Sequence, residues 1–196
     1  MLTPKRLTID EVISRIITVN DGIRQFWKKA DGWAPVEAAK LLSKSRLDWQ
    51  VSLSTCLNMW RAIPKNNEGG LILAWANLGS LVEGSMKLFL SVYYKDYEKD
   101  IDAFKDKKTN KLIDPDILEL ERLRVFFSKK KIWGKNKSWD KWILHIQQRR
   151  NAVHAYKHKD IGNQKEFFED VRKYHLFLEF INGSLPYPDE NYSSSE

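Results

Sequence analysis

The chain has 196 residues, which suits one domain that buries a hydrophobic core without disulfide or metal staples. Its composition is 42% hydrophobic and 30% charged, with 9 Gly and 6 Pro, which excludes collagen-like, low-complexity and wholly disordered chains. The one cysteine, Cys56, excludes a disulfide framework and a cysteine-based zinc cluster, and it indicates a reducing compartment. The first ten residues contain no apolar run of the signal-peptide kind, so we expect a cytoplasmic protein.

The formal net charge of +7 is concentrated in one stretch. Residues 128–159, the basic window, carry ten lysines and arginines and one acid, Asp140, so the window has a charge of +9 and the rest of the chain sums to −2. A basic patch predicts a polyanionic partner, and RNA or DNA is the first choice. The alternative is a lysine-rich loop that is merely solvated.

Helix signals dominate the first half of the chain. Thr8 can cap a first helix, because two acids follow in its first turn, and apolar residues then recur at helical spacing as far as Trp27. Gly32 is the expected stop of this helix. A second helix opens at Pro35, which fits a first turn, and ends by Pro64.

The segment 71–94 is the most apolar part of the chain. It is long enough for a membrane span, but Asn77, Glu83 and Lys87 interrupt it, so we expect a helix buried in a bundle and no membrane association. Small residues along it predict the close approach of another helix, since glycine in mid-helix needs a packing reason: Gly79, Ser80, Gly84 and Ser85.

The second half of the chain predicts three more helices. A charged linker is expected over 95–113, followed by a fourth helix over 114–127. Ser138 can cap a fifth helix, and a sixth is expected over 163–181.

These patterns include no strand signal and no internal repeat. The predicted fold class is therefore all-α, a bundle of about five to six helices with short antiparallel connections. We expect a single domain over 1–185 and a flexible C-terminal tail over 186–196.

The stretch QQRRNAVHAYKHKDIG, residues 147–162, gathers residue types that act on phosphate esters. Arginine holds phosphate oxygens and stabilises charge that develops on them, and histidine moves a proton at neutral pH. Together they suffice to cleave RNA by its own 2′-hydroxyl, which supplies the nucleophile, so neither a metal ion nor a cofactor is required. The chain has no phosphate-cradling glycine loop and no metalloprotease or hydrolase motif.

In this stretch the chain resembles the HEPN superfamily, whose hallmark is an arginine followed by a histidine after four to six residues. Arg149 and His154 have this spacing, and Tyr156 extends it to the Arg-x4-His-x-Tyr form of HepT-type toxins. The match covers about ten residues. It implies a HEPN-like helical bundle, a homodimer whose two motifs meet in a shared basic cleft, and a metal-independent ribonuclease of toxin–antitoxin or phage-defence type. Arg149, Arg150, His154 and Tyr156 are then the candidate catalytic residues.

The residue after the motif arginine departs from the family pattern. It is usually Asn or Asp, whereas here it is Arg150, with Asn151 one place later. At about 100° per residue, Arg150 and His154 lie about 40° apart on a helix, while Arg149 and His154 lie about 140° apart. We therefore expect Arg150 to be the neighbour of His154, and Arg149 to join only across a subunit boundary or where the helix frays.

Each candidate also has a structural interpretation. Arg150 falls at the edge of a predicted buried stripe and can pair with a core acid, His154 can be a satisfied structural histidine, and Tyr156 is expected to pack. Glu83 can orient an arginine or histidine of the site, but we favour the ordinary surface pair with Lys87, four residues on. The predicted stripe consists of Trp139, Trp142, Ile143, Ile146 and Val153.

The sequence thus supports two hypotheses. The first is a HEPN-like endoribonuclease that binds RNA and forms a homodimer, with an antitoxin or other protein as a possible partner. The second is a non-catalytic HEPN-like helical module that holds a protein or nucleic acid on its basic face. The expected nucleic-acid contacts are Lys129, Lys130, Lys131, Lys157 and His158, with Asn151 and Glu83 as support and no metal site.

Overall fold

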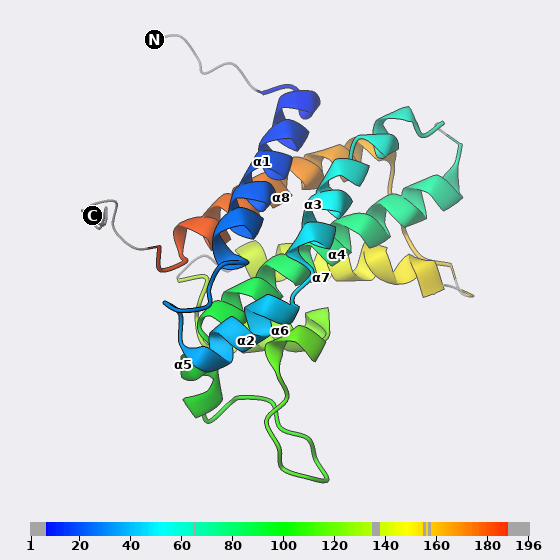
Figure 1. The fold of residues 1–196 in the computed structure, drawn as a ribbon. Coiled ribbons are helices and arrows are strands. Elements are labelled where there is room, and N and C mark those ends of the chain that lie inside the picture. The colour runs from blue at the N-terminus through cyan, green and yellow to red at the C-terminus, as the bar shows by residue number, and fades with distance from the viewer. Residues whose placement is uncertain (1–6, 65, 135–137, 155, 157, 188–196) are drawn as a thin grey trace, which may run out of the picture.

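The computed structural model describes residues 7–187 apart from 65, 135–137, 155 and 157. Over this part of the chain the fold is all-α, and its one β feature is an isolated bridge between Lys105 and Leu112 (Figure 1). The α-helices of the described residues are α1 (Ile9–Trp27), α2 (Val36–Lys44), α3 (Leu47–Cys56), α4 (Glu68–Val92), α5 (Tyr94–Lys99), α6 (Leu120–Lys129), α7 (Ser138–Arg150) and α8 (Gln164–Gly183). Short 3-10 turns are η1 (Met59–Ala62), η2 (Pro115–Ile117) and η3 (Asn151–His154).

The described residues form eight α-helices, more than the five to six expected, because the predicted second helix is divided and the expected linker is partly helical. The predicted second helix divides at Ser45, whose backbone is extended (ψ 142°) and whose hydroxyl donates to the carbonyl oxygen of Leu42 at 2.6 Å. The expected linker contains the short helix α5. The predicted fourth helix begins at Leu120, since the segment that starts at Pro115 forms only a 3-10 turn.

Helix α4 is the centre of the bundle. It packs against α2, α3, α6, α7 and α8, while α1 packs on α3 and α8. Figure 1 shows α4 running through the molecule with α3 on one side and α7 on the other. Trp75, Leu78 and Val82 of α4 are fully buried, as the apolar pattern predicts. Within the described residues, none of the helices combines the length and apolar character that crossing a bilayer requires.

Both ends of the described chain are tied to the bundle. Thr8 caps α1 as predicted, in a capping box with Glu11. The flexible tail was expected to begin at residue 186, but the Trp27 indole N–H donates to the hydroxyl of Tyr187 at 3.1 Å. The rest of the expected tail, 188–196, lies outside the described residues.

Gly79 brings α4 and α7 close together, as the small residues of α4 predict. A Cβ at this position would lie 2.6 Å from Cδ and 3.0 Å from Cβ of Arg150. The aliphatic part of Arg150 therefore lies directly on the α4 backbone. Gly84 has the same role toward α3, where a Cβ would meet the side-chain oxygen of Gln50 at 2.3 Å.

We expect Gly79→Ala to destabilise the fold by about 1–3 kcal/mol, because the new methyl group overpacks the α4–α7 contact. Urea denaturation measures the free energy of unfolding. The matched control is Gly22→Ala in the interior of α1, where a Cβ would have no atom within 4 Å. That change removes only the helix penalty of glycine and should stabilise by about 0.5–1 kcal/mol. Equal effects of the two changes would contradict this packing.

Candidate functional site

The end of α7 and the turn η3 border a pocket of roughly 340 Å³. Arg150, Asn151 and His154 line one side of it, Glu83 and Lys87 of α4 line the floor, and the segment 117–121 closes the other side. We call this the Arg150/His154 pocket. The structure thus brings together four of the residues singled out from the sequence, Arg150, Asn151, His154 and Glu83.

The side chain of Arg150 runs over the surface of α4 to reach the pocket. Its stem lies on Gly79, and its Nη1 donates to a carboxylate oxygen of Glu83, one helical turn further along α4. The side chain of Arg150 is 30% exposed, and its other N–H groups have no partner among the described residues. One part of the guanidinium is therefore fixed, while the rest is available to an anion.

Glu83 combines the two roles that the sequence left as alternatives. It accepts from Arg150 and also from Lys87 at 2.7 Å, so the favoured interpretation as a surface pair alone is wrong. The Glu83 side chain is only 15% exposed. Burial raises the pKa of Glu83, but the hydrogen bonds from Lys87 and Arg150 outweigh this and leave its pKa lowered. One carboxylate thus holds two cations at the pocket.

His154 is the last residue of η3 and is exposed. The helix tightens into a 3-10 turn directly after Arg150, so the regular 100° spacing does not extend to His154. Both side chains nevertheless line the same pocket. A solvent-reachable histidine beside an arginine is the arrangement that proton transfer to a bound phosphate ester requires.

Arg149 lies elsewhere. It is 7% exposed, its Nη1 donates to Asp160 at 2.6 Å, its Nη2 donates to Glu166 at 3.0 Å, and its guanidinium lies 5.7 Å from the ring centroid of Trp75. It therefore lies away from His154, as the helical spacing predicts, and packs against α8 and the 158–163 loop. Gly162, at φ +60°, leaves room for these groups, because a Cβ would meet Glu166 at 2.2 Å and Arg149 at 2.8 Å. Arg149 therefore fastens the loop after the candidate site.

The other motif residues also lie outside the Arg150/His154 pocket. Tyr156 is fully exposed, so the expected packing role is wrong, and it borders a separate depression together with His158. Val153 is 43% exposed and does not belong to the buried stripe that was predicted to include it. Lys157 lies outside the described residues.

Gln147 is a residue of this pocket that sequence reasoning missed. It lies one turn before Arg150 on α7 and lines the same pocket. Its Oε1 is buried and has no hydrogen-bond partner among the described residues. A buried acceptor without a donor is unfavourable unless a ligand satisfies it. The three-residue spacing from Arg150 is the signal that places it on this face.

The expected lysine cluster of the basic window is partly neutralised. Lys129 binds Asp102, and Lys130 binds both Asp100 and Asp102. The hydrogen bonds to Asp100 and Asp102 raise the pKa of Lys130, and the same lysines lower the pKa of Asp102. Lys131 is exposed without an ion pair among the described residues. The predicted linker, which supplies the two acids, therefore covers part of the cationic surface.

Comparison of the chain with protein-family models, curated proteins and solved structures finds no match. Within the described residues, no group of three or more His, Cys, Asp or Glu side chains is arranged to hold a metal ion.

We expect Glu83→Gln to lower the free energy of unfolding by about 1–2 kcal/mol at neutral pH, because it leaves Arg150 and Lys87 without their anion. The folded-state pKa of Glu83 is lowered, so its stabilisation is present above the unfolded value of about 4.3 and is lost as the pH falls through the folded value. The gap between wild type and variant should be constant above about pH 5 and narrow below it. Denaturant unfolding from pH 3 to 7 measures this.

The matched control for Glu83 is Glu119→Gln. Glu119 lines the same pocket but is exposed and has no ion pair among the described residues. Its replacement should change stability by less than about 0.5 kcal/mol. A gap for Glu83→Gln that does not depend on pH would show that its ion pairs contribute nothing.

Proposed function

We propose that the chain is a HEPN-like, metal-independent endoribonuclease that cleaves RNA by attack of the 2′-hydroxyl. The observation that carries this proposal is the pocket in which exposed His154 and partly free Arg150 lie together. The resemblance supports the proposal through His154, but the Arg-x4-His spacing belongs to Arg149, which lies outside the pocket. The arginine that shares the pocket is Arg150, four positions before His154, whereas Arg149 has a positioning role through the loop that follows the site.

The reaction needs three groups. A base removes the proton of the 2′-hydroxyl, whose oxygen attacks the phosphorus, while an acid protonates the departing 5′-oxygen. His154 serves as one of these, and the free N–H groups of Arg150 stabilise the charge on the phosphorane oxygens. The products are a 2′,3′-cyclic phosphate and a 5′-hydroxyl. DNA lacks the nucleophile and is not a substrate.

Gln147 and Lys87 fit supporting roles in this reaction. The buried Oε1 of Gln147 is an acceptor that a ribose hydroxyl can satisfy, which would align the 2′-hydroxyl and favour RNA over DNA. Lys87 shares Glu83 with Arg150 and keeps a second cation in the pocket lining. The lining also includes Glu119 and Glu121, so two cations face three carboxylates, of which Glu121 is paired with Arg124 outside the pocket.

The proposal includes a homodimer, in which a second copy supplies the other acid or base group. Exposed apolar side chains around the pocket support such an interface. Ile117 lines the pocket at 69% exposure, and Val153, directly before His154, is 43% exposed. Leu144 lies one turn before Gln147 and is 36% exposed. An antitoxin that covers the same face would mask the site.

We expect His154→Ala to lower the rate of single-stranded RNA cleavage by about 10²–10⁴-fold and to leave the Tm unchanged, because the residue is exposed. Wild-type activity should persist in EDTA and yield a 2′,3′-cyclic phosphate. The assay follows a labelled oligonucleotide on a gel, with native mass measured on the same sample. The matched control is His158→Ala, an exposed histidine outside this pocket, which as an expected RNA contact can weaken binding but should retain the cleavage rate at saturating RNA.

The alternative function is a non-catalytic module that binds a protein or nucleic acid. The ion pair of Arg150 with Glu83 favours it, because a structural arginine is paired in the same way. This alternative would stand if the wild-type protein cleaves no RNA at any pH from 5 to 9, or if His158→Ala and His154→Ala reduce activity equally.

The acids that pair with Lys129 and Lys130 lead to a prediction about the affinity for RNA. We expect Asp102→Asn to strengthen RNA binding and to steepen the dependence of log K on log salt by about 1 for each lysine that it frees for a phosphate. Fluorescence anisotropy across a salt titration measures this slope. The control is Asp31→Asn, which removes an exposed acid with no ion pair among the described residues. Equal slopes for the two variants would place the RNA away from α6.

A further inference from the structure

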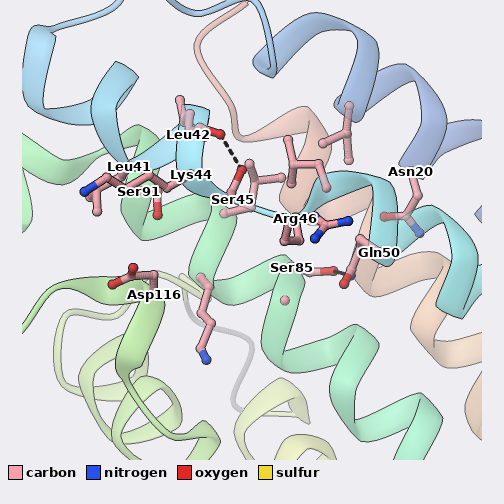
Figure 2. A pocket seen from close by; sticks show the side chains of 15 residues that line it. Asn20, Leu41, Leu42, Lys44, Ser45, Arg46, Gln50, Ser85, Ser91 and Asp116 are labelled. Atoms are coloured by element: carbon pink, nitrogen blue, oxygen red, sulfur yellow. Dashed lines mark hydrogen bonds between the residues drawn. The ribbon is translucent and has the colours of Figure 1, made fainter.

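A second pocket lies beside the Arg150/His154 pocket, between α1, α2, α3 and α4. It has a volume of roughly 230 Å³ and apolar walls that include Leu42, Leu47 and Leu88. Figure 2 shows the polar groups Asn20, Gln50 and Ser85 at one end, and Ser91 and Asp116 at the other. We call it the Gln50/Ser91 pocket. A concave, mostly apolar site with a few convergent polar groups is typical of ligand binding.

Two polar groups of this pocket lack a hydrogen-bond partner among the described residues. Ser91 is 5% exposed, and its hydroxyl makes no hydrogen bond, although serines in helices commonly donate to the preceding turn, as Ser85 does to Leu81 at 2.9 Å. The amide nitrogen of Gln50 donates to the carbonyl oxygen of Leu81 at 2.8 Å, but its Oε1 accepts from no described group. The hydroxyl of a mostly buried serine and a fixed amide oxygen are thus free to meet a ligand.

Gly84 preserves the position of that amide oxygen. A Cβ at Gly84 would lie 2.3 Å from Oε1 and 2.8 Å from the amide carbon of Gln50. Any side chain at Gly84 would therefore displace the Gln50 amide. The same amide nitrogen is within 3.4 Å of the hydroxyl of Ser85 and 3.5 Å of that of Tyr174, so its orientation is set by several buried acceptors. The Gln50 amide is therefore held in its orientation before a ligand binds.

The two pockets meet at Lys87. This residue lines both, and the consecutive residues Asp116 and Ile117 line one each. Further cations border the Gln50/Ser91 pocket. Lys44 is exposed and has no ion pair among the described residues, while Arg46 is paired with Asp48. A ligand that fills the second pocket therefore places an attached anion next to Lys87.

We propose that the Gln50/Ser91 pocket holds the base of the nucleotide next to the phosphate that is cleaved in the Arg150/His154 pocket. The volume is below the ~300–1,000 Å³ of drug-sized sites and suits a single base. The apolar walls contact the faces of the ring, Gln50 Oε1 accepts from a ring or amino N–H, and the Ser91 hydroxyl pairs with a second edge group. Lys87 then faces the phosphate. This inference rests on the proposed ribonuclease function.

Calorimetric titration with 5′-AMP and 5′-UMP as probes tests the pocket without relying on cleavage. Loss of one hydrogen bond in Ser91→Ala should weaken binding by about fivefold, and Gly84→Ala, which displaces the Gln50 amide, by about tenfold or more. The control is Ser80→Ala in the same helix, whose hydroxyl bonds to Ala76 and does not line the pocket. Binding should be unchanged in Ser80→Ala.

The natural ligand is either an RNA strand or a free mononucleotide. Comparing the binding of a mononucleotide with that of a tetranucleotide that has a 2′-deoxy sugar at the cleavage position distinguishes the two. Tighter binding of the tetranucleotide, weakened by Ser91→Ala, supports the inference. Equal binding of tetranucleotide and mononucleotide overturns it in favour of a free nucleotide.

The pocket inference and the proposed function fail in different ways. If neither probe binds at millimolar concentration, or if Ser91→Ala and Gly84→Ala bind as wild type, the inference is wrong even when RNA is cleaved. If the probes bind through Ser91 but no RNA is cleaved, the pocket is a nucleotide site and the ribonuclease proposal is wrong. Ser91→Ala keeps the test valid if Gly84→Ala does not fold.

Discussion

The contact of Arg150 with α4 determines how the second half of the chain meets the first. Helix α4 is buried on most sides, so a charged partner can reach it only where a small residue leaves space and an acid lies nearby. Gly79 and Glu83, one turn apart, meet both conditions. The Glu83 carboxylate holds the guanidinium of Arg150. This contact fixes the position of the end of α7 along α4 and its rotation about its own axis. That placement also sets the position of η3, the 3-10 turn that ends at His154.

The adjacent arginines Arg149 and Arg150 differ in role because they lie on different faces of α7. Arg149 is buried against α8 and is satisfied by two carboxylates and the face of Trp75. Both of its terminal nitrogens donate to a carboxylate, and breaking such a network would cost stability. Arg150 shares one carboxylate with Lys87, so part of its donor capacity is unused. Of the two, Arg150 is the one whose N–H groups a ligand can reach, because its side chain is 30% exposed and lines a pocket.

Much of the architecture could be predicted from the sequence, and the errors have identifiable causes. Hydrophobic periodicity, the Thr8 cap and the small residues of α4 predicted the all-α fold, the start of α1 and the close helix contacts. Periodicity could not predict the break at Ser45, because that depends on a local hydrogen bond to Leu42 rather than on apolar spacing. The 3-10 turn at Pro115 was missed because the backbone is extended at Leu118 and Glu119, with ψ of 135° and 155°, and separates the turn from α6.

The candidate site was predicted in part. The helical wheel paired Arg150 with His154, and both line one pocket, whereas Arg149 and Tyr156 lie outside it. The wheel assumes a regular helix beyond Arg150 and contains no information on distant acids, so it placed Val153 in the buried stripe and did not predict the partners of Arg149. The acids that bind Arg149 lie on the following loop and helix, and only tertiary structure brings them there.

The same limit applies to charge. The basic window carries +9 in the sequence, but among the described residues four of its ten cations are paired. Asp100 and Asp102 bind Lys129 and Lys130, Asp160 and Glu166 bind Arg149, and Glu83 binds Arg150. The formal charge of the window therefore overstates the positive charge that is free to meet a polyanion. Under the proposed function, the cations that meet phosphate are Lys87 and Arg150, which share one carboxylate. Because charges at the surface are screened over distance, the proposed recognition depends on contacts inside the pockets, where the unpaired groups of Gln147, Gln50 and Ser91 lie.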